Sequence, residues 1–244
     1  MSAGTSTRDQ MDDTKPVILF VAGFGDNASM FETMADTKLA ESYRLLPLNL
    51  PGFGAPPLGQ KTTLNSLAQA LSEEAVRYGA EIIVAHSVAS IIASLAAAEA
   101  NCPLKTIISL EGNITAQDAY FSGTAADYDD PVAFRTAFLE RLDEMAHAAP
   151  IIQRYRNEVS KADPLALWQL GTDARHFSAS CVPGEVLKTA GRVSYLYNPD
   201  NCPDSTVRWL EENEMERMVL ENATHWPSVD QPIALAEKIA EALH

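Results

Sequence analysis

The chain alternates short, continuous runs of apolar residues with longer segments in which apolar residues recur every three or four positions. Continuous apolar runs are typical of parallel strands that helices cover on both faces. Six segments, most of them such runs, predict strands at 17–22, 43–48, 81–86, 105–110, 192–197 and 216–220. Their alternation with helical segments predicts an α/β fold, a doubly wound and mostly parallel sheet with right-handed crossovers.

Helical periodicity predicts helices over residues 64–77, 88–100 and 231–243. Thr63 is the expected N-cap of the first of these helices, and Gly79 is its expected stop signal. The apolar residues expected to be buried are Leu64, Leu67, Leu71 and Val76 in the first helix, and Ile233, Leu235, Ala236, Ile239 and Leu243 in the last. Each helix would therefore pack one face against the sheet.

Residues 114–188 interrupt this alternation. They contain no convincing strand and predict two or three amphipathic helices, one starting at Asp130-Pro131 and another at Asp163-Pro164. Residues 1–15 are polar and are predicted to form a disordered tail. The chain therefore divides into an α/β core and a helical block.

Composition narrows the class of protein. A chain of 244 residues that is 46% hydrophobic can form one α/β domain with a full core. The net charge of −15 argues against nucleic acid and anionic membranes as partners, and favours a neutral small-molecule substrate. We expect a cytoplasmic protein, because the sequence shows neither a signal peptide nor a membrane-spanning run. A monomer or a homodimer is expected, and the sequence does not decide between them. Its three cysteines show no pairing pattern.

The run that ends at His86 carries the most informative feature of the chain. It is followed at once by Ser87 and then by a helix of small residues. A sharp turn from strand to helix would expose the Ser87 hydroxyl at the carboxyl end of the sheet, where a base can reach it. The first N–H groups of the helix have no intrahelical partner and could stabilise a developing oxyanion there.

Three further segments agree with this interpretation. With the serine segment first, the four stretches are Ala85-His86-Ser87-Val88-Ala89, Ala22-Gly23-Phe24-Gly25-Asp26, Asn49-Leu50-Pro51-Gly52-Phe53-Gly54 and Glu221-Asn222-Ala223-Thr224-His225-Trp226-Pro227. They resemble the G-x-S-x-G nucleophile elbow, the H-G-F-G loop, the D-x-P-G-x-G loop and the G-H-W-P loop of the α/β-hydrolase family. Together they span nearly the whole chain.

The sequence departs from the family pattern at four positions. Ala85 and Ala89 stand where the elbow usually has glycines, Ala22 replaces the usual histidine, and Asn49 replaces the usual aspartate. Each alanine adds only one methyl group, so we interpret the elbow as tightened and still formed.

The resemblance also implies a domain organisation. In this family an all-helical insertion before the penultimate strand forms a cap, or lid, and residues 114–188 occupy that position. The predicted core then comprises residues 16–113 and 189–244.

A serine nucleophile needs a histidine base, which in turn needs a carboxylate to orient it. The resemblance implies His225 as the base, whereas His86 would point away from the face of the strand that presents Ser87. Two residues are candidates for the acid. Glu111 follows the strand next to Ser87 and begins an E-G-N stretch that some subgroups share, whereas Asp200 follows the later strand, one residue out of register. We prefer Glu111.

The backbone N–H groups of Phe24 and Val88 are the predicted oxyanion donors. The residues predicted to line an apolar substrate pocket are Met30, Tyr120, Phe121, Trp168 and Trp226. No cluster of Cys, His and carboxylate residues has metal-ligand spacing, so neither a metal nor another cofactor is predicted.

The resemblance implies a metal-free serine hydrolase of a mostly apolar carboxylic ester or lactone, acting through an acyl-enzyme. Serine-triad relatives also hydrolyse carbon–carbon bonds, cleave thioesters, or catalyse lyase and cofactor-free oxygenase reactions, and the fold alone does not separate these activities. A weakly catalytic ligand-binding protein is a further alternative, because Ala85 and Ala89 alter the elbow.

Overall fold

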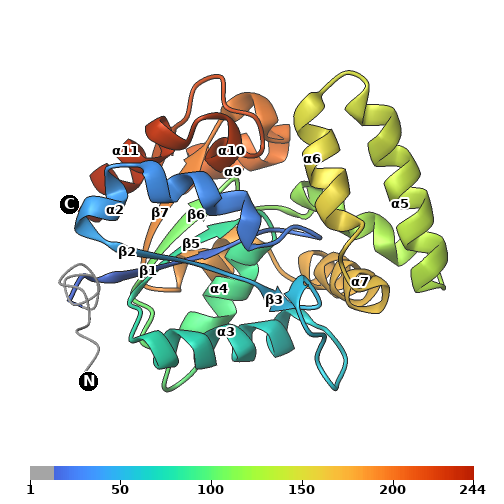
Figure 1. Ribbon diagram of the computed structural model, residues 1–244, viewed down its shortest axis with the longest axis horizontal. Coiled ribbons are helices and arrows are strands. Elements are labelled where there is room, and N and C mark those ends of the chain that lie inside the picture. The colour runs from blue at the N-terminus through green and yellow to red at the C-terminus, as the bar shows by residue number, and fades with distance from the viewer. Residues whose placement is uncertain (1–13) are drawn as a thin grey trace, which may run out of the picture.

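The computed structural model describes residues 14–244, in which a six-stranded parallel sheet forms the centre of the fold (Figure 1). The strand order is β2-β1-β5-β6-β7-β8. The strands are β1 (Val17–Val21), β2 (Arg44–Leu48), β5 (Ile82–His86), β6 (Thr106–Leu110), β7 (Arg192–Tyr197) and β8 (Glu216–Val219). The chain first builds one half of the sheet and then the other, which is a doubly wound topology.

All six strand predictions are confirmed within one residue at each end. The central strands are buried along almost their whole length, as their continuous apolar sequences require. In-register parallel pairing joins β5 to β6, and His86 pairs with Leu110 at the last step. Residues that directly follow these two strands therefore lie at the same edge of the sheet.

Helices cover both faces of the sheet (Figure 1). One face carries α3 (Leu64–Tyr78) and α4 (Ala89–Ala97), and the other carries η1 (Ala28–Asp36), α2 (Leu39–Ser42) and α11 (Pro232–Leu243). Shorter elements complete the core: β3 (Leu50–Pro51), β4 (Gly54–Ala55), η4 (Pro199–Asn201), α9 (Asp204–Glu212) and α10 (Pro227–Asp230). The predicted caps of α3 are confirmed, since Thr63 forms a capping box and Gly79 adopts the left-handed conformation.

Two burial predictions are wrong. Val76 is 52% exposed, because Ala75 and not Val76 continues the buried stripe that passes through Leu71. Ile233 is 69% exposed because it lies across the helix from the buried Leu235.

The segment between β6 and β7 is entirely helical, as predicted. It comprises η2 (Ala116–Ala119), η3 (Ser122–Asp127), α5 (Pro131–Ala146), α6 (Pro150–Val159), α7 (Pro164–Ser180) and α8 (Pro183–Lys188). Asp130 and Asp163 cap α5 and α7, whereas the sequence analysis did not single out α6. Figure 1 shows α5, α6 and α7 beyond one end of the sheet. We refer to this segment as the insertion.

The predicted tail, residues 1–15, lies outside the described residues apart from Thr14 and Lys15. Within residues 14–244, every helix is too short or too polar to span a bilayer.

Candidate active site

Ser87 occupies the turn between β5 and α4. Its φ angle is +53°, a conformation that non-glycine residues rarely adopt. The Ser87 N–H donates a hydrogen bond to the carbonyl of Leu110, the last residue of β6. The turn therefore has the strained backbone of a nucleophile elbow, and it is tied to the neighbouring strand.

The two alanines of the elbow are accommodated within the core. Ala85 and Ala89 are both completely buried, one at the end of β5 and the other at the start of α4. Their methyl groups fill space between the strand and the helix and do not prevent the turn.

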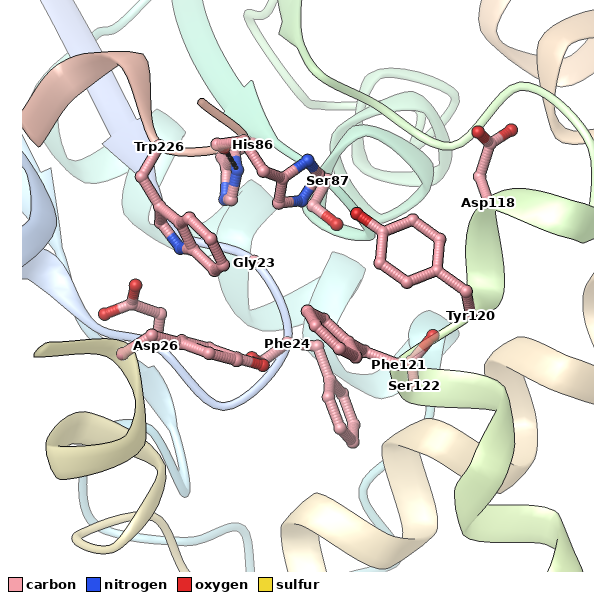
Figure 2. Close-up of a pocket in the computed structure, with 12 residues that line it drawn as sticks. Gly23, Phe24, Asp26, His86, Ser87, Asp118, Tyr120, Phe121, Ser122 and Trp226 are labelled. Carbon is pink, nitrogen blue, oxygen red and sulfur yellow. Dashed lines mark hydrogen bonds between the residues drawn. The ribbon is translucent and has the colours of Figure 1, made fainter. Parts of the chain in front are cut away.

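A small cavity lies directly beside Ser87 (Figure 2). Its volume is about 10 Å³, enough for a single water molecule. The residues that line it come from the ends of β1, β5 and β8 or the loops that follow them, and from the insertion: Gly23, Phe24, Asp26, His86, Ser87, Asp118, Tyr120, Phe121, Ser122, Tyr155, His225 and Trp226. Ser87 and His225 therefore share one cavity, although 138 positions separate them in the sequence.

His225 lies in the loop that follows β8, and its side chain is 15% exposed. Three aromatic rings surround the imidazole, with ring-centroid distances of 4.7 Å to His86, 5.3 Å to Trp226 and 6.0 Å to Tyr120. These contacts restrict the orientation of the imidazole.

Of the two candidate acids, Glu111 lies next to His225. Its Oε2 is 3.5 Å from His225 Nδ1, and its side chain is only 2% exposed. Asp200 is exposed and forms no ion pair with His225 in residues 14–244. The separation of 3.5 Å is long for a hydrogen bond, and His225 Nδ1 has no closer partner among the described residues. Such contacts are often long in ligand-free sites.

The Glu111 carboxylate is held in place by hydrogen bonds to its other oxygen. Glu111 Oε1 accepts from the backbone N–H of Asn198 at 2.7 Å and from Asn201 Nδ2 at 3.2 Å. Gly112 follows directly, and a Cβ at that position would lie 2.1 Å from Ser109 Oγ. This close packing explains the glycine of the E-G-N stretch.

The two residues predicted to supply oxyanion donors lie close to Ser87. Within residues 14–244, neither the Phe24 N–H nor the Val88 N–H donates a hydrogen bond to a protein acceptor. The loop that carries Phe24 is close to the serine, since a Cβ on Gly23 would lie 2.8 Å from Ser87 Cβ. Both N–H groups therefore belong to residues close to Ser87 and lack a protein acceptor among the described residues.

Comparison with known proteins shows which family the chain belongs to. The sequence profile described as "Alpha/beta hydrolase family" matches residues 18–238. The chain belongs to the alpha/beta hydrolase family. Membership of this family supports hydrolase activity. No curated protein sequence matches the chain.

Solved structures of three family-like proteins superpose on nearly the whole chain. A thermophilic esterase from Thermogutta terrifontis is 18% identical, with a TM-score of 0.72 over 94% of this chain and 90% of the esterase. A 1H-3-hydroxy-4-oxoquinoline 2,4-dioxygenase is 18% identical, with a TM-score of 0.70 over 96% and 94%. An N-acyl homoserine lactonase is 13% identical, with a TM-score of 0.70 over 94% and 89%. At these identities the likeness shows the fold alone.

The prediction that His86 points away from the face of Ser87 is wrong, since both residues line the same cavity. The His86 ring lines the cavity, and its Nε2 lies 2.7 Å from the carbonyl oxygen of His225. Because a carbonyl only accepts, Nε2 must carry the proton. Burial lowers the pKa of His86 well below its usual value, and the neighbouring His225 adds to this shift. A neutral His86 thus ties β5 to the loop that carries His225.

Three of the five predicted pocket residues line the cavity: Tyr120, Phe121 and Trp226. The Tyr120 hydroxyl points toward Ser87 in Figure 2, and burial raises its pKa. Met30 and Trp168 do not line this cavity. Met30 is buried in the core, and Trp168 Nε1 donates to the Tyr128 carbonyl within the insertion. The predictions for Met30 and Trp168 rested on apolar character alone, which does not distinguish a pocket wall from a packed core.

Proposed function

We propose that the protein is a serine hydrolase that cleaves a mostly apolar carboxylic ester or lactone. Ser87 is the nucleophile, His225 the base and Glu111 the acid. The observation that carries this proposal is that Ser87 and His225 share one cavity while Glu111 lies 3.5 Å from His225 Nδ1. A carboxylate beside Nδ1 keeps the proton on that nitrogen, so that Nε2 is free to act as the base.

Acylation begins when Ser87 Oγ attacks the substrate carbonyl and its proton passes to His225 Nε2. The carbonyl oxygen becomes an oxyanion, which accepts hydrogen bonds from the free N–H groups of Phe24 and Val88. Each such donor stabilises the transition state by about 3–4 kcal/mol. The alcohol oxygen then leaves, takes the proton from His225, and an ester to Ser87 remains.

Deacylation repeats the same steps with water. His225 removes a proton from water, the resulting hydroxide attacks the acyl carbonyl, and the same two N–H groups bind the oxyanion. When the tetrahedral intermediate collapses, Ser87 Oγ leaves and regains the proton from His225. The acid product is released, and Glu111 stays ionised throughout.

The insertion serves as a cap over this site. Tyr120, Phe121 and Tyr155 come from the insertion and line the cavity, which supports an apolar substrate group at this wall. The cavity of about 10 Å³ is far smaller than an ester. Substrate therefore enters only when these aromatic side chains move apart.

The direct test is hydrolysis of p-nitrophenyl butyrate by Ser87→Ala. We expect kcat to fall by at least about 10⁴-fold, because removal of a triad nucleophile leaves only the oxyanion hole and binding. Ser94→Ala is the matched control. Ser94 is a buried serine of α4, the helix that follows Ser87, and its hydroxyl donates to the Ser90 carbonyl, so its loss should leave kcat nearly unchanged. Wild-type rates in Ser87→Ala would refute the proposal.

A second candidate is cofactor-free oxygenase chemistry, which the structural likeness to a quinoline dioxygenase favours. A panel that contains a p-nitrophenyl ester, an acyl thioester, a vinylogous diketone and a 3-hydroxy-4-oxoquinoline separates the candidates. Ester turnover without oxygen consumption supports the hydrolase, whereas oxygen uptake with the quinoline alone supports the alternative.

A further inference from the structure

Helix α6 of the insertion contacts the loop that carries the predicted oxyanion donor. We call residues 23–27 the oxyanion loop. The Tyr155 hydroxyl donates to the Phe24 carbonyl at 2.6 Å, and both groups are buried. The next contact along the loop is an ion pair between the Arg154 guanidinium and the Asp26 carboxylate.

The contact continues on both sides of these two bonds. Asn27 Nδ2 donates to Glu158 Oε2 at 2.6 Å, one turn further along α6. A Cβ on Gly25 would lie 2.9 Å from Val159 Cγ2, so helix and loop backbone are in close contact. From Phe24 to Asn27, each loop residue therefore meets α6.

The ion pair between Arg154 and Asp26 helps to hold the oxyanion loop in place because it is largely buried. The Asp26 side chain is 1% exposed and that of Arg154 is 24% exposed. Burial raises the pKa of Asp26, and the adjacent Arg154 charge opposes this shift. An Asp26 carboxylate without Arg154 would be a buried charge lacking its main partner.

The hydrogen bonds fix the peptide groups on both sides of Phe24. The Gly23 carbonyl accepts from the Asp26 N–H at 3.2 Å, within the loop itself. Because the peptide is planar and trans, the Phe24 N–H points opposite to that carbonyl. The second peptide, which carries the Phe24 carbonyl, is held by Tyr155. Both peptides are therefore linked to α6, the first through Asp26, whose side chain pairs with Arg154, and the second through Tyr155.

The geometry points to Tyr155 and Arg154 as positioning residues that hold the Phe24 N–H in place for the oxyanion. This inference rests on the proposed function and extends it, because it makes the insertion part of the catalytic arrangement as well as a cover. Tyr155 also packs against Trp226, the neighbour of His225, with a centroid distance of 5.1 Å. One side chain thus contacts both the oxyanion loop and the histidine loop.

The test is Tyr155→Phe, which removes one oxygen and keeps the ring. With p-nitrophenyl butyrate we expect kcat to fall by about 10- to 100-fold, as for a small misplacement of a catalytic group, while KM changes by less than about twofold. Affinity for a trifluoromethyl ketone, which forms a tetrahedral adduct with an oxyanion, should fall by a similar factor. Loss of a merely structural bond would lower stability and leave both quantities unchanged.

Thr37→Val is the matched control, because it also removes a buried hydroxyl that donates to a backbone carbonyl, that of Met34, away from the site. It should lose stability without losing kcat. Should Tyr155→Phe fail to fold, Arg154→Met provides the second test, with the same split between kcat and KM expected.

The outcomes separate the inference from the proposed function. Wild-type kcat and inhibitor affinity in a folded Tyr155→Phe, or a change in KM alone, would overturn the inference. A wild-type protein that is inactive and also fails to bind the trifluoromethyl ketone would overturn the proposed function, and this inference with it.

Discussion

Strained backbone is concentrated around the candidate active site. Among the described residues, only three other than glycine have a positive φ: Ser87 at +53°, Glu111 at +50° and Asn222 at +60°. The first two are the proposed nucleophile and acid, and Asn222 begins the loop that carries His225. Such conformations cost about 1–3 kcal/mol each and persist where the surroundings impose them. They occur where the chain brings Ser87 to the cavity that His225 also lines and Glu111 to within 3.5 Å of His225 Nδ1.

At this scale the first prediction concerns the acid. Glu111→Gln should lower kcat by about 10³- to 10⁴-fold, because the amide no longer stabilises the imidazolium or fixes its tautomer. Asp200→Asn is the matched exchange at the rejected position, and it should leave kcat within about twofold of wild type. Steady-state rates on p-nitrophenyl butyrate decide between them. A large loss in Asp200→Asn alone would reverse the assignment, and two mild effects would exclude both residues.

A second prediction concerns His86. Its pKa is lowered in the folded protein, so below about pH 6.5 the unfolded chain binds a proton that the folded protein does not. The free energy of unfolding should therefore decrease as the pH falls below about 6.5, by up to about 1.4 kcal/mol per pH unit from this residue.

Urea unfolding at several pH values measures this effect. His86→Gln keeps a donor for the His225 carbonyl but does not titrate, so its decrease over the same pH range should be smaller than that of wild type. His147→Gln replaces an exposed histidine and should keep the wild-type slope. Identical slopes in wild type and His86→Gln would contradict the buried, neutral histidine.

The elements differ in how strongly the sequence determines them. Most of the strands were predictable because they are largely continuous apolar runs, which the covered centre of a parallel sheet requires. Helix α6 was not singled out, because it buries only Ile152, Tyr155 and Val159 among polar residues. The sequence did not decide between the two candidate acids for a related reason. Glu111 and Asp200 both follow strands, and only the three-dimensional arrangement brings one of them to His225.

A prediction at the scale of the element tests the start of α3. Thr63 Oγ1 accepts from the Ser66 N–H at 3.0 Å, and Ser66 Oγ accepts from the Thr63 N–H at 2.8 Å. Thr63→Ala should lower the free energy of unfolding by about 1 kcal/mol and Tm by about 2–4 °C. Thermal unfolding provides the measurement. Thr63→Ser keeps the hydroxyl and should keep most of the stability, so equal losses in both variants would argue against the cap.

At the scale of the whole molecule, net charge acts on the substrate before it binds. The charge of −15 creates a negative potential that repels anions, and salt screens this potential over about 8 Å at 0.15 M. Asp118 adds to it, since it lines the cavity, whereas the charge of Asp26 is offset by Arg154. We therefore expect the protein to favour neutral over anionic substrates at the stage of encounter.

This selection can be measured with two esters of equal chain length. The value of kcat/KM for the p-nitrophenyl monoester of succinate should rise severalfold between about 10 and 150 mM NaCl, because repulsion is screened. The neutral p-nitrophenyl butyrate should change by less than about twofold over the same range. A parallel response of both esters would show that net charge does not steer the substrate.

The central claim is that Ser87 is made nucleophilic by His225, and covalent labelling tests it most directly. Intact-protein and peptide mass spectrometry after treatment with an alkyl fluorophosphonate should find one adduct per chain, on the peptide that contains Ser87. The adduct should be nearly absent from His225→Ala. An unlabelled wild-type protein, an adduct on another residue, or equal labelling of His225→Ala would contradict the account.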